Sequence, residues 1–111
     1  MSRNRQEVVY ICGPLRSDSA YERQRNTALA RTAAIWAWNK GYAVICPHLN
    51  SGGIHMVREE TLMVGSKELV ARCDRIVLIP GWERSVGSKD ELAVANSLLI
   101  PTMTLSMRQL E

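Results

Sequence analysis

The stretch Arg75–Ser106, RIVLIPGWERSVGSKDELAVANSLLIPTMTLS, contains the pattern that decides the fold. It opens with a continuous apolar run at 75–81 that ends in Pro-Gly, as buried strands often do. The helical pattern SKDELAVANSLL follows at 88–99, with apolar residues on one face. A second apolar run at 100–106 indicates another strand. A strand, a helix and a strand in this order predict a βαβ unit with parallel strands.

The same alternation extends towards the N-terminus. A strand is expected at Val8–Gly13, where an apolar run is followed by proline. A long helix is expected over Ala20–Lys40, because Ser19 and Glu22 have the spacing of a capping box at its start. The run YAVIC at 42–46 predicts the next strand.

The segment between the second and third predicted strands is less regular. Its first part, from His48, has the composition of a loop, and a helical pattern begins at Arg58. The Gly65-Ser66 pair is expected to break that helix, and Ser66 would then cap a short helix over 67–73.

This order of elements predicts one domain, residues 1–111, of the α/β class. We expect a doubly wound, mostly parallel sheet of four to five strands with helices on both faces, as in flavodoxin-like or Rossmann-like folds. The carboxyl ends of parallel strands lie on one rim of such a sheet, and ligands bind there. The loops 13–19, 47–53 and 80–88 should therefore converge, although they are far apart in the sequence.

Composition and charge exclude several classes of protein. The net charge is +3 and the basic residues are spread along the chain, so neither a nucleic-acid groove nor a nucleic-acid partner is expected. No apolar run approaches the ~20 residues of a membrane span, and the polar N-terminus predicts no signal peptide. The three cysteines, Cys12, Cys46 and Cys73, include no Cys-x-x-Cys pair. Reduced thiols in a cytoplasmic protein are expected.

The sequence is consistent with two roles for Glu91. Ser88 and Glu91 have the spacing of a capping box, so Glu91 can simply start a helix. However, Ala95 and Leu98 place it near the edge of the buried face, and the helix dipole favours its ionised form. An ionised carboxylate at a ligand-binding rim can attack an anomeric carbon. Capping and catalysis do not exclude each other.

The residues before Glu91 favour an anion site. Ser85, Gly87 and Ser88 lie where several backbone N–H groups of a helix start point outwards. An ordinary strand-to-helix turn would explain them equally well. Arg16 and Ser17, after the first strand, could add a charge and a hydroxyl to the same anion.

Two further residues are candidates for ligand contacts. Trp82 directly follows a strand, where it could stack on a base or form a dimer contact. His48 lies at the carboxyl end of the second strand and could hydrogen-bond a ligand. No Gly-x-Gly-x-x-Gly, Walker or Gly-x-Ser-x-Gly sequence is present. Dinucleotide binding, nucleoside triphosphatase activity and serine hydrolase chemistry are therefore not predicted.

Two segments, VYICGPLR at 9–16 and CDRIVLIPGWERSVGSKDELAVA at 73–95, resemble the nucleoside 2-deoxyribosyltransferase superfamily. The chain is similar to two branches: small phage and bacterial proteins with an LLPGWE signature, and 2′-deoxynucleoside 5′-phosphate N-hydrolases. The resemblance spans roughly Val8–Thr104. Its strongest part is Ser-Val-Gly-x-x-x-Glu-Leu at 85–92, and Tyr-x-Cys-Gly-x-x-Arg at 10–16 is its second anchor.

The resemblance implies a role for each matching residue. Glu91 matches a nucleophile that forms a glycosyl-enzyme intermediate at C1′ of the sugar, and Tyr10 matches a tyrosine that hydrogen-bonds it. Ser85, Gly87 and Arg16 match positions that hold a 5′-phosphate, and the substrate-binding set also includes Gly13, Ser17, His48, Trp82 and Ser88. The resemblance implies no metal and no organic cofactor, and it implies a homodimer or a larger homo-oligomer.

One position departs from the family pattern. The family has an aspartate eight residues before the aspartate of its Cys-Asp pair, and counting back from Asp74 gives Ser66. A serine cannot transfer a proton as a carboxylic acid does, although Ser66 is retained in the catalytic set. Glu68 would point about 200° away from position 66 on a helix, at ~100° per residue. Glu59 and Glu60 are conceivable substitutes.

These observations lead to an N-glycosidase-type enzyme that cleaves the base–sugar bond of a nucleoside 5′-monophosphate, with a 2′-deoxy sugar expected. A transferase that exchanges bases differs only in whether water or a free base attacks the intermediate. Two alternatives stay open. One is a nucleotide-binding module without turnover, which Ser66 favours, and the other is an oligomeric scaffold whose tryptophans form interfaces.

Overall fold

The computed structural model describes residues 5–50 and 56–111. Four strands, four α-helices and two short 3-10 helices alternate along this part of the chain. They are β1 (Val8–Cys12), α1 (Ala20–Asn39), β2 (Ala43–Ile45), α2 (Pro47–Asn50), α3 (Glu59–Ala71), β3 (Arg75–Leu78), η1 (Trp82–Arg84), α4 (Val86–Ser97), β4 (Thr102–Thr104) and η2 (Arg108–Leu110). None of the described helices is long and apolar enough to span a membrane.

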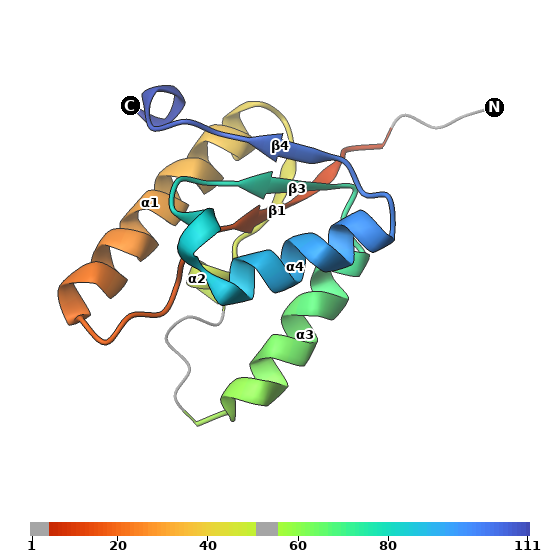
Figure 1. The fold of residues 1–111 in the computed structure, drawn as a ribbon. Coiled ribbons are helices and arrows are strands. Elements are labelled where there is room, and N and C mark those ends of the chain that lie inside the picture. Colours follow the sequence, from red (N-terminus) through yellow and green to blue (C-terminus); the bar gives the residue numbers. More distant parts are fainter. Residues whose placement is uncertain (1–4, 51–55) are drawn as a thin grey trace.

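The strands form one parallel sheet in the order β2-β1-β3-β4. Helix α1 covers one face, and α3 and α4 lie side by side over the other (Figure 1). This arrangement confirms the predicted doubly wound α/β fold, with the lower of the two expected strand numbers. The chain passes to opposite faces after β1 and β3, which are neighbours, so the switch point lies between their carboxyl ends.

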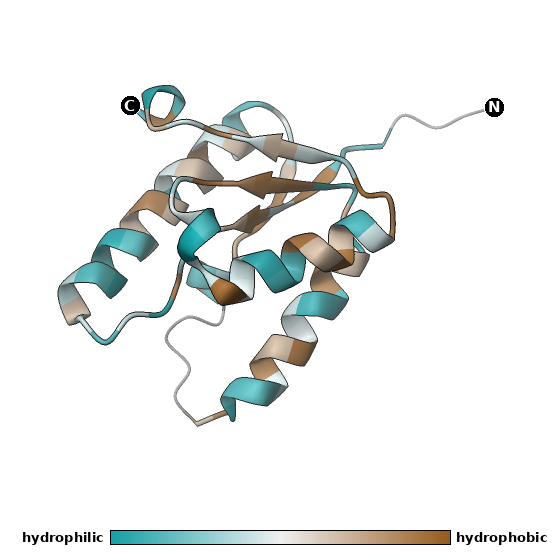
Figure 2. Cartoon of the chain, in the orientation of Figure 1, coloured by the Kyte–Doolittle hydropathy of each residue, from teal (hydrophilic) through white to brown (hydrophobic). Residues whose placement is uncertain are grey.

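Each face of the sheet has its own apolar core, and β1 contributes to both. Val9 and Ile11 pack towards α1, while Tyr10 and Cys12 pack towards α3 and α4. Successive side chains of a strand point to opposite faces, which accounts for this division. Strand β1 and most of β3 are hydrophobic (Figure 2), as expected for strands covered on both sides.

Helix α1 begins as predicted. The Ser19 hydroxyl accepts a hydrogen bond from the Glu22 backbone N–H at 3.2 Å. Small side chains on the buried face let the helix lie close to the sheet. These residues are Ala30, Ala33, Ala34 and Ala37. After the helix, Gly41 has φ of 94°, a conformation in which a side chain would be strained.

Helices α2, α3 and α4 differ from the predictions. Helix α2 occupies the start of the segment expected to be a loop. Gly65 and Ser66 do not break α3, which runs unbroken from Glu59 to Ala71. Glycine in a helix costs only about 1 kcal/mol relative to alanine, and packing of apolar residues such as the buried Val70 offsets it. Helix α4 ends at Ser97 instead of Leu99, which is left-handed with φ of 59°.

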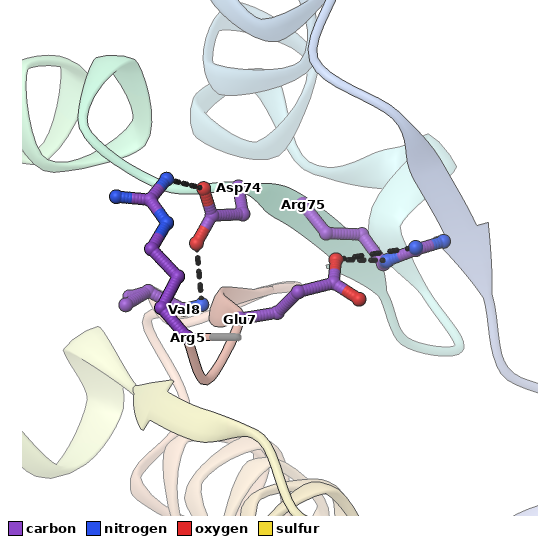
Figure 3. Close-up of polar contacts among 5 residues, drawn as sticks. All are labelled: Arg5, Glu7, Val8, Asp74 and Arg75. Carbon is purple, nitrogen blue, oxygen red and sulfur yellow. Dashed lines mark hydrogen bonds and ion pairs between the residues drawn. The ribbon is translucent and has the colours of Figure 1, made fainter. Parts of the chain in front are cut away.

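The amino-terminal edge of the sheet is fastened by polar contacts between β1 and β3 (Figure 3). Asp74 accepts a hydrogen bond from the Val8 backbone N–H at 2.8 Å and pairs with Arg5 at 2.7 Å. Arg75 pairs with Glu7 at 3.2 Å. These contacts hold the starts of the two central strands together, on the side away from the predicted ligand rim.

Candidate functional site

A cleft of about 1270 Å³ opens at the carboxyl end of the sheet. The loop after β1, the start of α2, the loop after β3 and one face of α3 contribute to its walls. The three predicted loops therefore do converge, although residues 51–53 of the second loop lie outside the described residues. Of the predicted site residues, those that line the cleft are Gly13, Arg16, Ser17, His48, Ser66, Ser85, Gly87, Ser88 and Glu91.

The helix that carries Glu91 starts earlier than its sequence indicated. Ser85 is the N-cap of α4, and its hydroxyl accepts the Ser88 backbone N–H at 3.2 Å. Glu91 consequently lies in the second turn, with its carboxylate directed at the sheet. The capping-box interpretation of Ser88 and Glu91 is wrong, because the cap one turn earlier already supplies the helix start.

Two side chains of β1 hold the Glu91 carboxylate. The Tyr10 hydroxyl donates to Oε2 at 2.5 Å, and the Cys12 thiol lies 3.4 Å from Oε1. Tyr10 is 0% exposed and Cys12 is 1% exposed, whereas Glu91 is partly exposed and lines the cleft. The carboxylate is thus held from inside the protein while it reaches the ligand space.

The side chains of Tyr10 and Cys12 are neutral hydrogen-bond donors to the Glu91 carboxylate. Burial, together with the Glu91 charge, raises the pKa values of Tyr10 and Cys12, so both keep their protons. Burial also raises the pKa of Glu91, against the hydrogen bonds from Tyr10 and Cys12 and the charge of Arg16. Glu91 is therefore harder to ionise than a carboxyl in water, and an ionised Glu91 is a stronger base.

The first turn of α4 borders the cleft, and its backbone at Gly87 is not covered by other atoms. A Cβ atom added to Gly87 would meet nothing within 4 Å, so its backbone is accessible from the cleft side. Ser85 is engaged as the N-cap, while the Ser88 hydroxyl is buried and has no hydrogen-bond partner. Accessible N–H groups at a helix start favour an anion.

The loop after β1 is already engaged in contacts with neighbouring elements. Arg16 forms an ion pair with Glu59 across the cleft, and Ser17 hydrogen-bonds Glu22 at the start of α1. Gly13 packs so closely on Ile79 that an added Cβ would lie 2.3 Å from its Cγ1 atom. Gly13 is thus required for packing, and Ser17 takes part in the helix cap.

His48 lines the cleft as expected, whereas Trp82 does not. The Nε2 atom of His48 lies 2.8 Å from the Pro14 carbonyl oxygen, and burial lowers the His48 pKa. The neutral ring therefore donates to that carbonyl and ties α2 to the loop after β1. Trp82 does not line the cleft and packs instead against the core under α3 and α4.

Helix α3 places Ser66 beside the Tyr10–Glu91 pair. Ser66 lines the cleft, and its side chain acts on Tyr10 so as to lower that pKa, against the effect of burial. Of the two conceivable substitutes, Glu59 lines the cleft, whereas Glu60 pairs with Arg58 and lies outside it. Ser66 is not a helix cap, because α3 continues through it.

The sequence interpretation missed the contact of Cys12 with Glu91. Cys12 was assigned only as a buried thiol, yet it follows Tyr10 by two residues on the same strand. Residues two apart on a strand share a face, so the position of Tyr10 carried the signal. Within residues 5–50 and 56–111, no three His, Cys, Asp or Glu side chains are arranged to hold a metal ion.

Comparison with known proteins identifies a family and a solved structure of similar fold. Residues 7–104 match the family model of a domain of unknown function, DUF4406. The chain belongs to this family. No curated protein sequence matches it. Among solved structures, it is similar to the CMP N-glycosidase BcmB of Clostridium botulinum, with a TM-score of 0.64 and 14% identity over 94% of this chain and 80% of that one. At that identity, the similarity shows a shared fold.

Proposed function

We propose that this protein is an N-glycosidase-type enzyme that cleaves the base–sugar bond of a nucleoside 5′-monophosphate, with a 2′-deoxy sugar preferred. The observation that carries the proposal is the carboxylate of Glu91, which lines the cleft while Tyr10 and Cys12 hold it from behind. A carboxylate held in one orientation at the edge of a cleft is suited to attack at an anomeric carbon.

The proposed reaction has two steps. An oxygen of ionised Glu91 forms a bond to C1′, and the electron pair of the C1′–N bond leaves with the base, which takes up a proton from water. A second water then attacks C1′, releases the Glu91 carboxylate and yields the sugar phosphate. If a free base attacks in place of water, the same intermediate gives base exchange.

The 5′-phosphate is assigned to the start of α4. Accessible backbone at Gly87 and the hydroxyl of Ser85 border the cleft there, and Arg16 supplies a positive charge. Arg16 is engaged by Glu59, so an incoming phosphate would have to displace that carboxylate.

The fold of BcmB supports the substrate class. That protein is a CMP N-glycosidase, and its overall structure is similar across most of this chain.

A second candidate is a nucleotide-binding module without turnover. Ser66 favours it, because it lines the cleft beside Tyr10 at the position where the resemblance implies an aspartate that handles the leaving base. Losing a general acid typically costs ~10²–10⁴-fold in rate.

One experiment separates the two. The protein is incubated with deoxyribo- and ribonucleoside monophosphates, free base is measured by chromatography, and binding by calorimetry. Base release from at least one 2′-deoxynucleoside monophosphate supports the enzyme. Binding without release supports the module, and no binding at all contradicts both.

A further inference from the structure

Cys12 has contacts that a packing residue does not need. Its sulfur lies 3.4 Å from Glu91 Oε1 and 3.5 Å from the Ser88 backbone carbonyl oxygen, so the carboxylate and the first turn of α4 both offer an acceptor to the one thiol proton. The side chain is 1% exposed and does not line the cleft, so a ligand there would not touch it.

We propose that Cys12 is a positioning residue, whose thiol fixes the Glu91 carboxylate on Oε1 while Tyr10 fixes it on Oε2. This inference rests on the proposed function, because it assigns a second support to the same nucleophile. With one donor on each oxygen, both from β1, the carboxylate plane is held against the sheet. A thiol is a weak donor, so Oε1 keeps more of its charge than Oε2.

The chemistry of the thiol agrees with this role. Burial and the charge of Glu91 raise the Cys12 pKa, so the sulfur stays protonated at neutral pH. It acts as a donor and not as a nucleophile, since the thiolate is the reactive form.

The other charged and titratable groups that act on Glu91 are few. Tyr10 on β1 and Arg16 after β1 lower the pKa of Glu91, and Asp90 on α4 raises it. None of these groups changes when Cys12 is replaced, so a shift in Glu91 ionisation would report the loss of the thiol donor or of its packing, and the Cys12→Ser variant separates the two.

The test compares Cys12→Ala, Cys12→Ser and the matched control Cys46→Ser. Cys46 is also a buried thiol, but it faces the Ala30 carbonyl on the other side of the sheet. Two readouts are used: the pH dependence of kcat for base release, and the carboxyl ¹³C shift of Glu91 against pH, which needs no turnover. Base release from wild-type protein tests the proposed function separately from the carbon shift.

In Cys12→Ala, the Glu91 pKa and the acid limb of kcat should rise, because the ionised carboxylate loses a donor, and kcat should fall by roughly 10-fold. Cys12→Ser should keep a lower Glu91 pKa than Cys12→Ala, and Cys46→Ser should match the wild type. An unchanged Glu91 titration in Cys12→Ala would overturn the inference. Equal shifts in the Ala and Ser variants would overturn it too, since packing alone would then set the pKa.

Discussion

The two ends of the central strands carry carboxylates in opposite settings. At the amino-terminal edge, Asp74 meets an arginine and a backbone N–H group, and its charge is matched by its partners (Figure 3). At the carboxyl edge, the hydrogen-bond donors to Glu91 among the described residues are a phenol and a thiol, both neutral, and Arg16 acts on it through its charge alone. The contacts of Asp74 link β1 to β3. The surroundings of Glu91 make its ionisation costly, so the ionised carboxylate is a stronger base than one in water.

The difference shows how one fold separates stability from chemistry. Matched charges at the edge of a sheet give modest stabilisation and fix the strand register. Burial makes a carboxylate costly to ionise, and that cost is retained at functional sites. Substitutions at the two ends should therefore have different effects on activity and on stability.

The largest effect is expected from Glu91→Gln. Base release should fall by at least about 1000-fold, because an amide cannot form the bond to C1′. Chromatography of free base measures this, and Glu60→Gln, an exposed residue outside the cleft, is the control. A Glu91→Gln variant with wild-type turnover would show that the carboxylate at this edge is structural.

Ser66→Asp should act in the opposite direction. If the proposed enzyme lacks an acid at this position, a carboxyl beside Tyr10 should raise kcat by ~10²–10⁴-fold. The gain is measured on the same substrate panel, with Ser66→Asn as a control of similar size that cannot donate an acidic proton. Equal rates in Ser66→Asp, Ser66→Asn and the wild type would indicate that the proton comes from elsewhere, with Glu59 the first candidate.

The fold and part of the site were predictable from the sequence for different reasons. Apolar runs alternating with a helical pattern define the strands and their order, and topology then brings the loops after β1 and β3 together. The start of α4 was misassigned because Ser85 and Ser88 are both acceptable caps three residues apart. Only the packing of α4 on β1 decides between them, by turning Glu91 towards Tyr10.

Other misassignments came from contacts that local sequence does not contain. The Gly65-Ser66 pair has a local preference to end a helix, yet tertiary packing of α3 outweighs it. The Arg16–Glu59 ion pair joins residues from distant segments, as does the bond from His48 to the Pro14 carbonyl. Neither pairing follows from the spacing of these residues in the sequence. The sequence therefore predicted a phosphate-binding role for Arg16 without showing that Glu59 competes with a phosphate for it.

Tyr10→Phe should have a smaller effect than the two active-site changes above. Removing the donor to Oε2 should slow base release by roughly 10–100-fold, since hydrogen bonds to charged groups contribute about 1.5–3 kcal/mol. The Glu91 pKa should rise, so the acid limb of the pH–rate profile should move to higher pH. An unmoved limb, measured between about pH 4 and 8, would contradict the assigned contact.

The smallest effects concern stability and should have opposite signs at the two ends. Asp74→Asn should lower the free energy of unfolding by about 0.5–1.5 kcal/mol, with base release unchanged. Because the folded-state pKa of Glu91 is raised, its stabilising contribution is present at low pH and lost as pH rises through that pKa. Glu91→Gln should therefore unfold at higher temperature than the wild type at pH 7, and this advantage should shrink near pH 4. Thermal unfolding is measured at both pH values. If Glu91→Gln lowered the unfolding temperature at pH 7, the expected opposite effects of the Glu91 and Asp74 substitutions would be wrong.

The most direct test is the distance from residue 91 to C1′ in a crystal structure of the Glu91→Gln protein with a 2′-deoxynucleoside 5′-monophosphate. We expect a side-chain oxygen or nitrogen of residue 91 about 3–3.5 Å from C1′, with the phosphate at the start of α4. A nucleotide bound with its phosphate beside residue 91 and its C1′ turned away from α4 would contradict it.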